Sequence, residues 1–163
     1  MKPRQLHVAE APAVWGLAAD LPDVNVWLAL LIVEHPHHAA ARRYWETNDA
    51  GCRRMFCRTT MLGVVRLLCE RRLMGPAVKT LPQAWSIYRQ LRESADVGFQ
   101  SDRETADKTL AQWLDTPAAP IPGRLWTDAW LAALAESSGL RLVSFDSDIK
   151  RFPLSRSLLL GAA

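Results

Sequence analysis

Short apolar runs alternate along this chain with longer segments in which apolar residues recur at helical spacing. Apolar runs of about four to eight residues are typical of buried strands, whereas a period of about 3.6 residues is typical of amphipathic helices. The pattern predicts strands at residues 15–21, 55–59, 97–99 and 140–145, with an edge strand at 157–160. It predicts helices at residues 24–33, 36–45, 61–74, 81–92, 101–114 and 126–138. Thr59 or Thr60 is the expected N-cap of the third helix.

The alternation of strands and helices predicts an α/β fold. We expect a three-layer α/β/α domain with a mainly parallel central sheet, because helices join the successive strands. The chain of 163 residues has the length of one domain, and no internal repeat divides it. Residues 17–163 are therefore predicted to form a single domain, and residues 1–16 an N-terminal extension with little pattern.

Composition narrows the class of protein further. Apolar residues make up 49% of the chain, which argues against intrinsic disorder. The longest apolar run, residues 26–33, is far shorter than the ~20 residues that cross a membrane, so no membrane association is expected. No signal-peptide pattern is present at the start, and we expect a cytoplasmic protein. The three cysteines have no CxxC spacing and are predicted to be reduced thiols.

Three aspartates stand where predicted strands or loops meet predicted helices. Asp23 directly follows the first strand, Asp146 follows strand 140–145, and Asp128 falls in the first turn of helix 126–138. The carboxyl ends of parallel strands meet at one edge of a sheet, where ligands bind. Carboxylates that are brought together repel one another, and a hard divalent cation such as Mg²⁺ or Mn²⁺ relieves this repulsion. The pattern therefore predicts a metal site at this edge.

Positive charge is concentrated in residues 42–72, which hold eight arginines and three acidic residues. One interpretation is a surface that faces phosphate, because arginine binds phosphate in bidentate geometry. The other is a solvated helix face that meets a protein partner. A carboxylate site beside an arginine-rich surface suggests a metal-dependent nuclease.

Tryptophan and histidine give weaker signals. Trp126, close to Asp128, is a candidate for contact with substrate. The other tryptophans at apolar helical positions are predicted to pack in the core: Trp27, Trp45, Trp85 and Trp130. The histidines near Pro36 are expected to cap, pack or face solvent rather than bind a metal: His35, His37 and His38.

The order and spacing of these motifs resemble the PIN domain family. The resemblance is carried by Leu21-Pro22-Asp23-Val24-Asn25-Val26-Trp27, the helix from His37 to Trp45, Phe56-Cys57-Arg58-Thr59, Met74-Gly75, Trp126-Thr127-Asp128-Ala129-Trp130 and Leu142-Val143-Ser144-Phe145-Asp146. It covers residues 17–160 and is similar to the VapC toxins of bacterial toxin–antitoxin pairs. The resemblance implies a Mg²⁺- or Mn²⁺-dependent endoribonuclease that cleaves structured RNA such as tRNA or rRNA. It also implies a VapB-like antitoxin as partner and a homodimer.

The resemblance also assigns roles to single residues. Asp23, Asp128 and Asp146 would be the catalytic, metal-binding carboxylates, with Asp148 as an additional metal ligand. Asn25 and Thr127 would be the groups that orient these carboxylates.

The chain departs from the family at the second acidic position. PIN domains usually place a glutamate at the start of the helix after the second strand, and this chain has Met61 there. Methionine does not ligate a hard cation. Glu70 follows nine residues after Met61. Because each helical residue turns by about 100°, Glu70 would project from the opposite side of the helix. We therefore expect one usable metal site.

Two alternatives follow from these departures. A degenerate PIN domain would bind RNA or an antitoxin without cleavage, because of Met61. A phosphotransferase that resembles the haloacid dehalogenases needs an aspartate two residues after its Asp nucleophile, and Asn25 stands at that position after Asp23.

Overall fold

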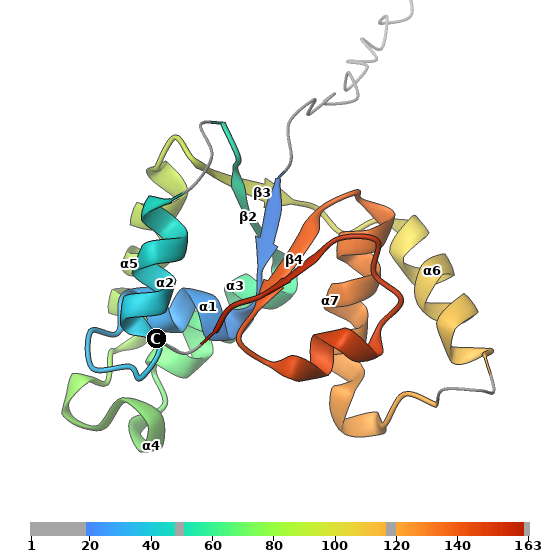
Figure 1. Ribbon diagram of the computed structural model, residues 1–163. Helices are drawn as coiled ribbons and strands as arrows, with labels where there is room; N and C mark the ends of the chain where they lie inside the picture. The colour runs from blue at the N-terminus through green and yellow to red at the C-terminus, as the bar shows by residue number, and fades with distance from the viewer. Residues whose placement is uncertain (1–18, 48–50, 117–119, 162–163) are drawn as a thin grey trace, which may run out of the picture.

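Five parallel strands form the central sheet in the computed structural model, which describes residues 19–47, 51–116 and 120–161 (Figure 1). They are β1 (Asp20–Pro22), β2 (Arg54–Cys57), β3 (Val97–Gln100), β4 (Arg141–Ser144) and β5 (Ser157–Leu159). The strand order is β3-β2-β1-β4-β5, and every neighbouring pair is parallel. The first strand thus lies at the centre, with strands from the middle and from the end of the chain on either side.

Helices cover both faces of this sheet (Figure 1). The α-helices are α1 (Val24–Leu31), α2 (His38–Glu46), α3 (Arg58–Leu68), α4 (Arg71–Met74), α5 (Leu81–Glu93), α6 (Glu104–Leu114) and α7 (Trp126–Ser137). The 3-10 helices within the described residues are η1 (Gly75–Ala77), η2 (Gly123–Leu125) and η3 (Ser147–Arg151). Helices α6 and α7 pack on one face, and α1, α2, α3 and α5 on the other. The predicted three-layer α/β/α fold with a parallel sheet is confirmed.

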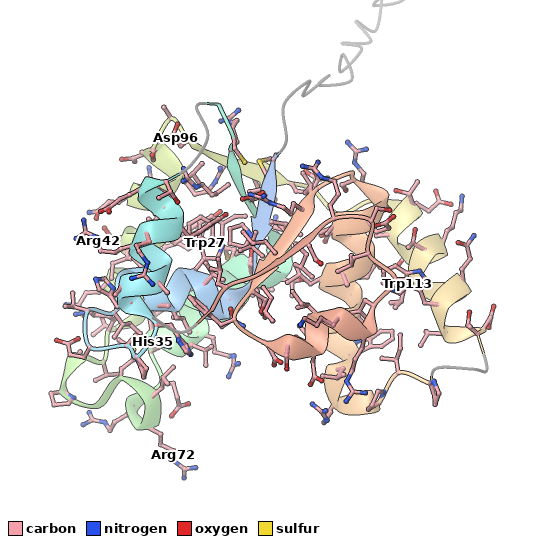
Figure 2. The ribbon with its side chains drawn as sticks, viewed as in Figure 1. Trp27, His35, Arg42, Arg72, Asp96 and Trp113 are labelled. Atoms are coloured by element: carbon pink, nitrogen blue, oxygen red, sulfur yellow. The ribbon has the colours of Figure 1, made fainter. Side chains whose placement is uncertain are left out.

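Strand β2 contributes side chains to the apolar clusters on both faces of the sheet. Met55 and Cys57 join the apolar cluster on the α6–α7 face, whereas Phe56 joins the cluster on the opposite face. Successive side chains of a strand point to opposite faces, so a continuous apolar run serves both. Trp27 of α1 stacks on Phe56, with ring centroids 3.9 Å apart and planes at 12°; it is labelled in Figure 2. The first helix is thereby held against the middle of the sheet.

A buried ion pair joins the amino ends of β1 and β4. Asp20 is fully buried and receives hydrogen bonds from Nε and Nη2 of Arg141, both at 2.8 Å. The Tyr44 hydroxyl of α2 donates a third hydrogen bond to Oδ2 of Asp20 at 2.7 Å. Burial and the neighbouring Asp20 carboxylate raise the pKa of Tyr44, which keeps its hydroxyl a donor. These contacts anchor the end of the sheet that lies opposite the carboxyl ends of the strands.

Three local predictions are wrong. Helix α3 has Cys57 rather than Thr59 or Thr60 as its N-cap, and the Thr60 hydroxyl instead accepts a hydrogen bond from the Cys57 backbone at 3.0 Å. The helix predicted at 61–74 is two helices, because Glu70 takes an extended conformation and caps α4 by accepting from the Arg72 backbone. Trp85 is 45% exposed and does not lie in the core.

Other expectations fall partly or wholly outside the described residues. The extension at residues 1–16 and most of the strand predicted at 15–21 lie there, although β1 marks the end of that strand. All three cysteines are free, as expected, with Cys52 and Cys57 buried. Across the described ranges, the helices are too short or too polar to traverse a bilayer.

Candidate functional site

Three carboxylates meet at the carboxyl ends of β1 and β4. Asp23 follows β1 and caps α1, Asp146 follows β4 and caps η3, and Asp128 lies in the first turn of α7. They share one small pocket, which is lined by Asp23, Asp128, Leu131, Leu142, Asp146, Asp148 and Ile149. Its free volume of about 10 Å³ is close to that of one water molecule or ion. The sheet edge where the sequence predicted the carboxylates to meet is the edge where they lie.

A hydrogen-bond network fixes the orientation of Asp23. Oδ1 accepts from the Val24 backbone at 2.6 Å, and Oδ2 accepts from Asn25 Nδ2 at 2.7 Å and from the Ser144 hydroxyl at 2.9 Å. Ser144 Oγ in turn accepts from Asn25 Nδ2 at 2.8 Å and from the Asp146 backbone at 3.0 Å. Ser144 therefore holds two of the three acidic positions together.

Sequence reasoning assigned an orienting role to Asn25 but missed Ser144. The Asn25 side chain also accepts a hydrogen bond from the Phe145 backbone at 3.2 Å, so it bridges the loops after β1 and β4. The available signal for Ser144 was a polar residue at the end of an apolar strand, directly before the site aspartate. Thr127 is exposed, and its side chain makes no hydrogen bond within the described part of the chain.

Mutual repulsion and burial act on the carboxylates. Burial raises the pKa of Asp23, and the charges of Asp128 and Asp146 raise it further, against the hydrogen bonds from Ser144 and Val24. Burial likewise raises the pKa of Asp128, together with the charges of Asp146 and Asp148. Two neighbouring carboxyl groups thus resist ionisation until a positive charge compensates them.

Asp148 differs from these carboxylates because it is already paired with two arginines. Arg124 Nη1 lies 3.0 Å from Oδ2 of Asp148, and Arg151 Nε lies 2.6 Å from Oδ1. These contacts hold the pKa of Asp148 below its usual range. As a metal ligand, Asp148 would have to exchange one of these contacts for the cation.

The pocket fits a hard cation in donor chemistry. Its polar walls are carboxylates, and Mg²⁺ and Mn²⁺ prefer oxygen ligands of this kind. Among the described residues, no three His, Cys, Asp or Glu side chains are arranged to hold a metal ion. The side chains would therefore have to draw inward around a cation.

The second acidic position of the family lies outside this pocket. Met61 is 6% exposed and belongs to the apolar cluster that contains Trp27 and Phe56. Glu70 caps α4 and is exposed. Neither Met61 nor Glu70 lines the acidic pocket. For Glu70 this agrees with the expectation that it cannot replace the missing acid.

The arginines of residues 42–72 differ in their surroundings. Arg54 is buried, donates to the Trp45 carbonyl, and lies with its guanidinium carbon 4.3 Å from the centroid of the Trp45 ring. Arg42 forms an ion pair with Glu46 on the surface of α2. The cations beside the acidic pocket are instead Arg124 and Arg151, which sequence reasoning did not single out.

Two aromatic features border the site. Trp126, at the start of α7, is 57% exposed and remains a candidate for contact with substrate. His37 stacks on Phe145, with ring centroids 4.5 Å apart and planes at 12°. Because Phe145 lies between Ser144 and Asp146, this stacking supports the loop that carries the site.

The fold and this site define the class of the protein, and a comparison with known families agrees. The chain belongs to the PIN domain family, whose match extends over residues 21–154. It is 33% identical over 138 residues to Ribonuclease VapC41 of Mycobacterium tuberculosis. The aligned region covers 81% of this chain and 92% of that protein.

Solved structures share the fold. The crystal structure of VapC20 of Mycobacterium tuberculosis, described as a Sarcin-Ricin loop cleaving toxin, matches with a TM-score of 0.59 and 21% identity, over 82% of this chain and 93% of that chain. VapBC2 from Rickettsia felis, bound to a DNA fragment from its promoter, matches with a TM-score of 0.65 and 10% identity, over 88% and 99% of the two chains. These structures confirm the fold, and the relative at 33% identity confirms the resemblance to VapC toxins.

Proposed function

We propose that this protein is a divalent-metal-dependent endoribonuclease, a toxin of the VapC type. The observation that carries the proposal is the convergence of Asp23, Asp128 and Asp146 on one pocket at the carboxyl ends of β1 and β4. The raised pKa of Asp23 and of Asp128 supports a site built to receive a cation. Similarity to a protein named as a VapC ribonuclease supports RNA as the substrate.

Each residue of the pocket has a distinct part in this proposal. Asp23, Asp128 and Asp146 would hold Mg²⁺ or Mn²⁺, with Asp148 as a further ligand. When bound, the ion would lower the pKa of a water molecule and neutralise charge on the phosphodiester during in-line attack. Asn25 and Ser144 would keep Asp23 in its orientation, and Thr127 would act on Asp128. Arg124 and Arg151 would attract the phosphates of the RNA backbone.

The partners follow from the same proposal. A VapB-like antitoxin would neutralise the protein, and the VapBC assembly among the structural neighbours supports a partner of this kind. A structured RNA such as tRNA or rRNA would be the substrate, and the protein would act as a homodimer in the cytoplasm. Met61 favours a single metal site, because its side chain lies in the apolar cluster.

Expression of the wild type and of Asp23→Asn and Asp128→Asn variants in bacteria tests the proposal. We expect growth arrest with the wild type, loss of arrest with both variants, and new RNA ends that disappear when purified protein is assayed in EDTA. Asp96→Asn is the matched control, since Asp96 is exposed and directly precedes β3, at the amino ends of the strands (Figure 2).

The outcome also separates cleavage from binding alone. RNA binding by the wild type without metal-dependent cleavage would make the chain a degenerate PIN domain. Equal growth of cells that express the wild type and both variants, with the protein folded and abundant, would overturn the toxin proposal.

A further inference from the structure

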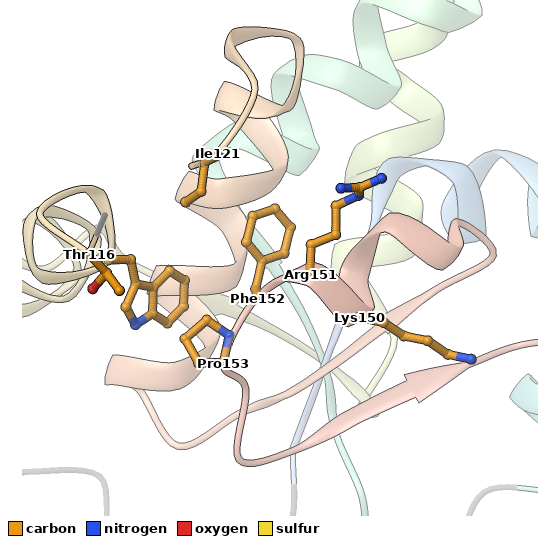
Figure 3. A pocket seen from close by; sticks show the side chains of 7 residues that line it. Thr116, Ile121, Lys150, Arg151, Phe152 and Pro153 are labelled. Atoms are coloured by element: carbon orange, nitrogen blue, oxygen red, sulfur yellow. The ribbon is translucent and has the colours of Figure 1, made fainter. Parts of the chain in front are cut away.

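A second, larger pocket lies at the other end of η3 from the acidic one. Figure 3 shows the residues that line it. Its volume is about 280 Å³, and its walls include Trp113, Thr116, Ile121, Lys150, Arg151 and Phe152. The pocket therefore lies between the end of α6, Ile121 before η2, and the end of η3. Pockets for drug-sized ligands usually measure about 300–1,000 Å³, so this one suits a single ring system.

The inner walls of this pocket are aromatic and apolar. The rings of Trp113 and Phe152 are nearly parallel, with centroids 6.2 Å apart and planes at 18°. Phe152 is buried in the core, whereas Trp113 is only partly buried against it; Trp113 is labelled in Figure 2. A planar ligand can stack on such a surface without any specific hydrogen bond.

The rim of the pocket is positively charged. Lys150 and Arg151 are both exposed, and none of the described residues that line the pocket is acidic. Figure 3 shows the two cationic side chains extending away from Phe152 at the side that η3 forms. Lys150 is the cation of this rim that has no ion pair within the described part of the chain, whereas Arg151 pairs with Asp148. An aromatic surface beside exposed cations is typical of sites for single-stranded nucleic acid, which presents bases and phosphates together.

Helix η3 connects this pocket to the acidic site. Asp146 caps its start, Asp148 lies in its first turn, and Lys150 and Arg151 end it. Arg151 belongs to both sites, since its Nε donates to Asp148 at 2.6 Å while its side chain lines the second pocket. Five residues of 3-10 helix rise by only about 10 Å. The two sites are therefore close enough for one nucleic-acid strand with a phosphate at the carboxylates to reach the aromatic pocket as well.

We propose that this pocket binds one unpaired base of the RNA strand next to the bond that is cleaved, by stacking on Trp113. The proposal rests on the proposed ribonuclease function and names a part of the substrate. Lys150 and Arg151 contact the phosphate that flanks this base. The pocket therefore selects RNA in which a base next to the cleaved bond is free of pairing.

Binding of single-stranded RNA in EDTA tests the proposal without any dependence on catalysis. The probe is a fluorescein-labelled RNA hexamer of random sequence, measured by fluorescence anisotropy, with a hexamer of abasic nucleotides as its counterpart. Stacking of one base contributes about 1–3 kcal/mol. Trp113→Leu removes the stacking surface, and Thr116→Trp fills the pocket. Each is expected to weaken binding of the random hexamer by about five- to a hundredfold.

Matched variants separate stacking, charge and folding. Trp113→Phe keeps an aromatic ring and is expected to bind within about threefold of the wild type. Lys150→Gln is expected to weaken binding of both hexamers, whereas Lys108→Gln, an exposed lysine of α6 paired with Glu104, leaves binding unchanged. Thermal melting identifies any variant that has lost its fold, and Thr116→Trp changes an exposed residue that the core does not need.

The occupant is identified by two small probes. Adenosine monophosphate and N-acetyltryptophanamide are titrated into ¹⁵N-labelled protein, and the indole signal of Trp113 is assigned from its loss in Trp113→Phe. A shift with the nucleotide supports the base site. A shift only with N-acetyltryptophanamide, or unchanged RNA affinity in folded Trp113→Leu and Thr116→Trp, overturns it and leaves a site for a protein side chain. Failure of the nuclease itself appears separately, as absence of cleavage by a wild type that still binds RNA.

Discussion

The Ser144 hydroxyl lies 2.9 Å from Oδ2 of Asp23, although the two residues are 121 positions apart in the chain. Because Ser144 Oγ also accepts a hydrogen bond from the Asp146 backbone, one hydroxyl determines the separation of two acidic residues. The geometry of the site therefore depends on a residue that carries no charge.

Ser144→Ala is expected to lower RNA cleavage or Mg²⁺ affinity by about 10- to 100-fold, as is typical when a group that orients a metal ligand is removed. Ser144→Thr keeps the hydroxyl and should retain more activity, provided that thermal melting shows an intact fold. Cleavage rates across a Mg²⁺ titration measure the effect. If Ser144→Ala cleaves RNA like the wild type, the hydrogen bond has no part in the site.

Asp128→Asn is expected to stabilise the metal-free protein, because it removes a charge that repels Asp23 and Asp146. A gain of about 1 kcal/mol would raise Tm by about 2–4 °C in a domain of this size. In the wild type, Mg²⁺ at about 100 times its dissociation constant should stabilise by about 2.7 kcal/mol, and this gain should be lost in the variant. Calorimetric scans in EDTA and in Mg²⁺ measure both, with Asp96→Asn as control. A lower Tm of Asp128→Asn in EDTA would contradict the repulsion.

The raised pKa of Asp23 and of Asp128 predicts a pH dependence of defined sign. Protons compete with the cation for these carboxylates, so metal affinity should rise as pH rises through their pKa values. Stability of the metal-free protein should change in the opposite direction. The folded state holds these protons more tightly than the unfolded state, so this contribution is complete below the unfolded pKa of about 3.8 and is lost as pH rises through the folded pKa. Urea unfolding and Mn²⁺ titration across pH 4–7 check both signs, and a flat Mn²⁺ affinity would contradict the prediction.

Met61→Glu tests whether the missing acid limits metal binding. The new carboxylate would lie in the apolar cluster around Trp27 and Phe56, so we expect a loss of about 2–5 kcal/mol in EDTA. If Met61 marks the missing ligand, the variant should also bind Mn²⁺ more tightly or in a higher ratio, as calorimetric titration measures. Met61→Leu, which conserves volume, should cost less than about 1.5 kcal/mol and leave Mn²⁺ binding unchanged. Equal Mn²⁺ affinity and stoichiometry in the wild type and in Met61→Glu would contradict the hypothesis of a missing ligand at this position.

Asp20→Ala is expected to destabilise the protein by about 3 kcal/mol, because it leaves the Arg141 guanidinium without its partner. The double variant Asp20→Leu with Arg141→Met should recover much of this loss, since no unpaired charge then remains. Urea unfolding of Asp20→Leu, of Arg141→Met and of the double variant measures the coupling. A double variant that is as unstable as the sum of the two single changes would show that the pair contributes nothing as a pair.

Much of the fold followed from local pattern. The apolar run at 140–145 located β4, and the alternation of strands and helices predicted the parallel sheet. The place of Asp23 and Asp146 then followed from a general property of parallel sheets, whose strand ends share one edge. Sequence could therefore indicate where the acidic site lies.

What the sequence could not show depends on tertiary contacts. Helical spacing placed Trp85 on the apolar face of α5, but it did not reveal that Trp85 stays exposed while Tyr88 on the same helix is buried. A count of charges could not separate Arg54, which is buried against Trp45, from the arginines at the surface. Arg124 and Arg151 become neighbours only through Asp148, so no local pattern marks them.

The central position of β1 determines when the site can form during synthesis. Asp23 belongs to the first strand, but its partners Ser144 and Asp146 follow a strand that is made near the end of the chain. A nascent chain that lacks β4 cannot orient Asp23 or complete the acidic pocket. The acidic pocket can therefore first form only when nearly the whole chain has been made, because β4 and Asp146 lie close to its end.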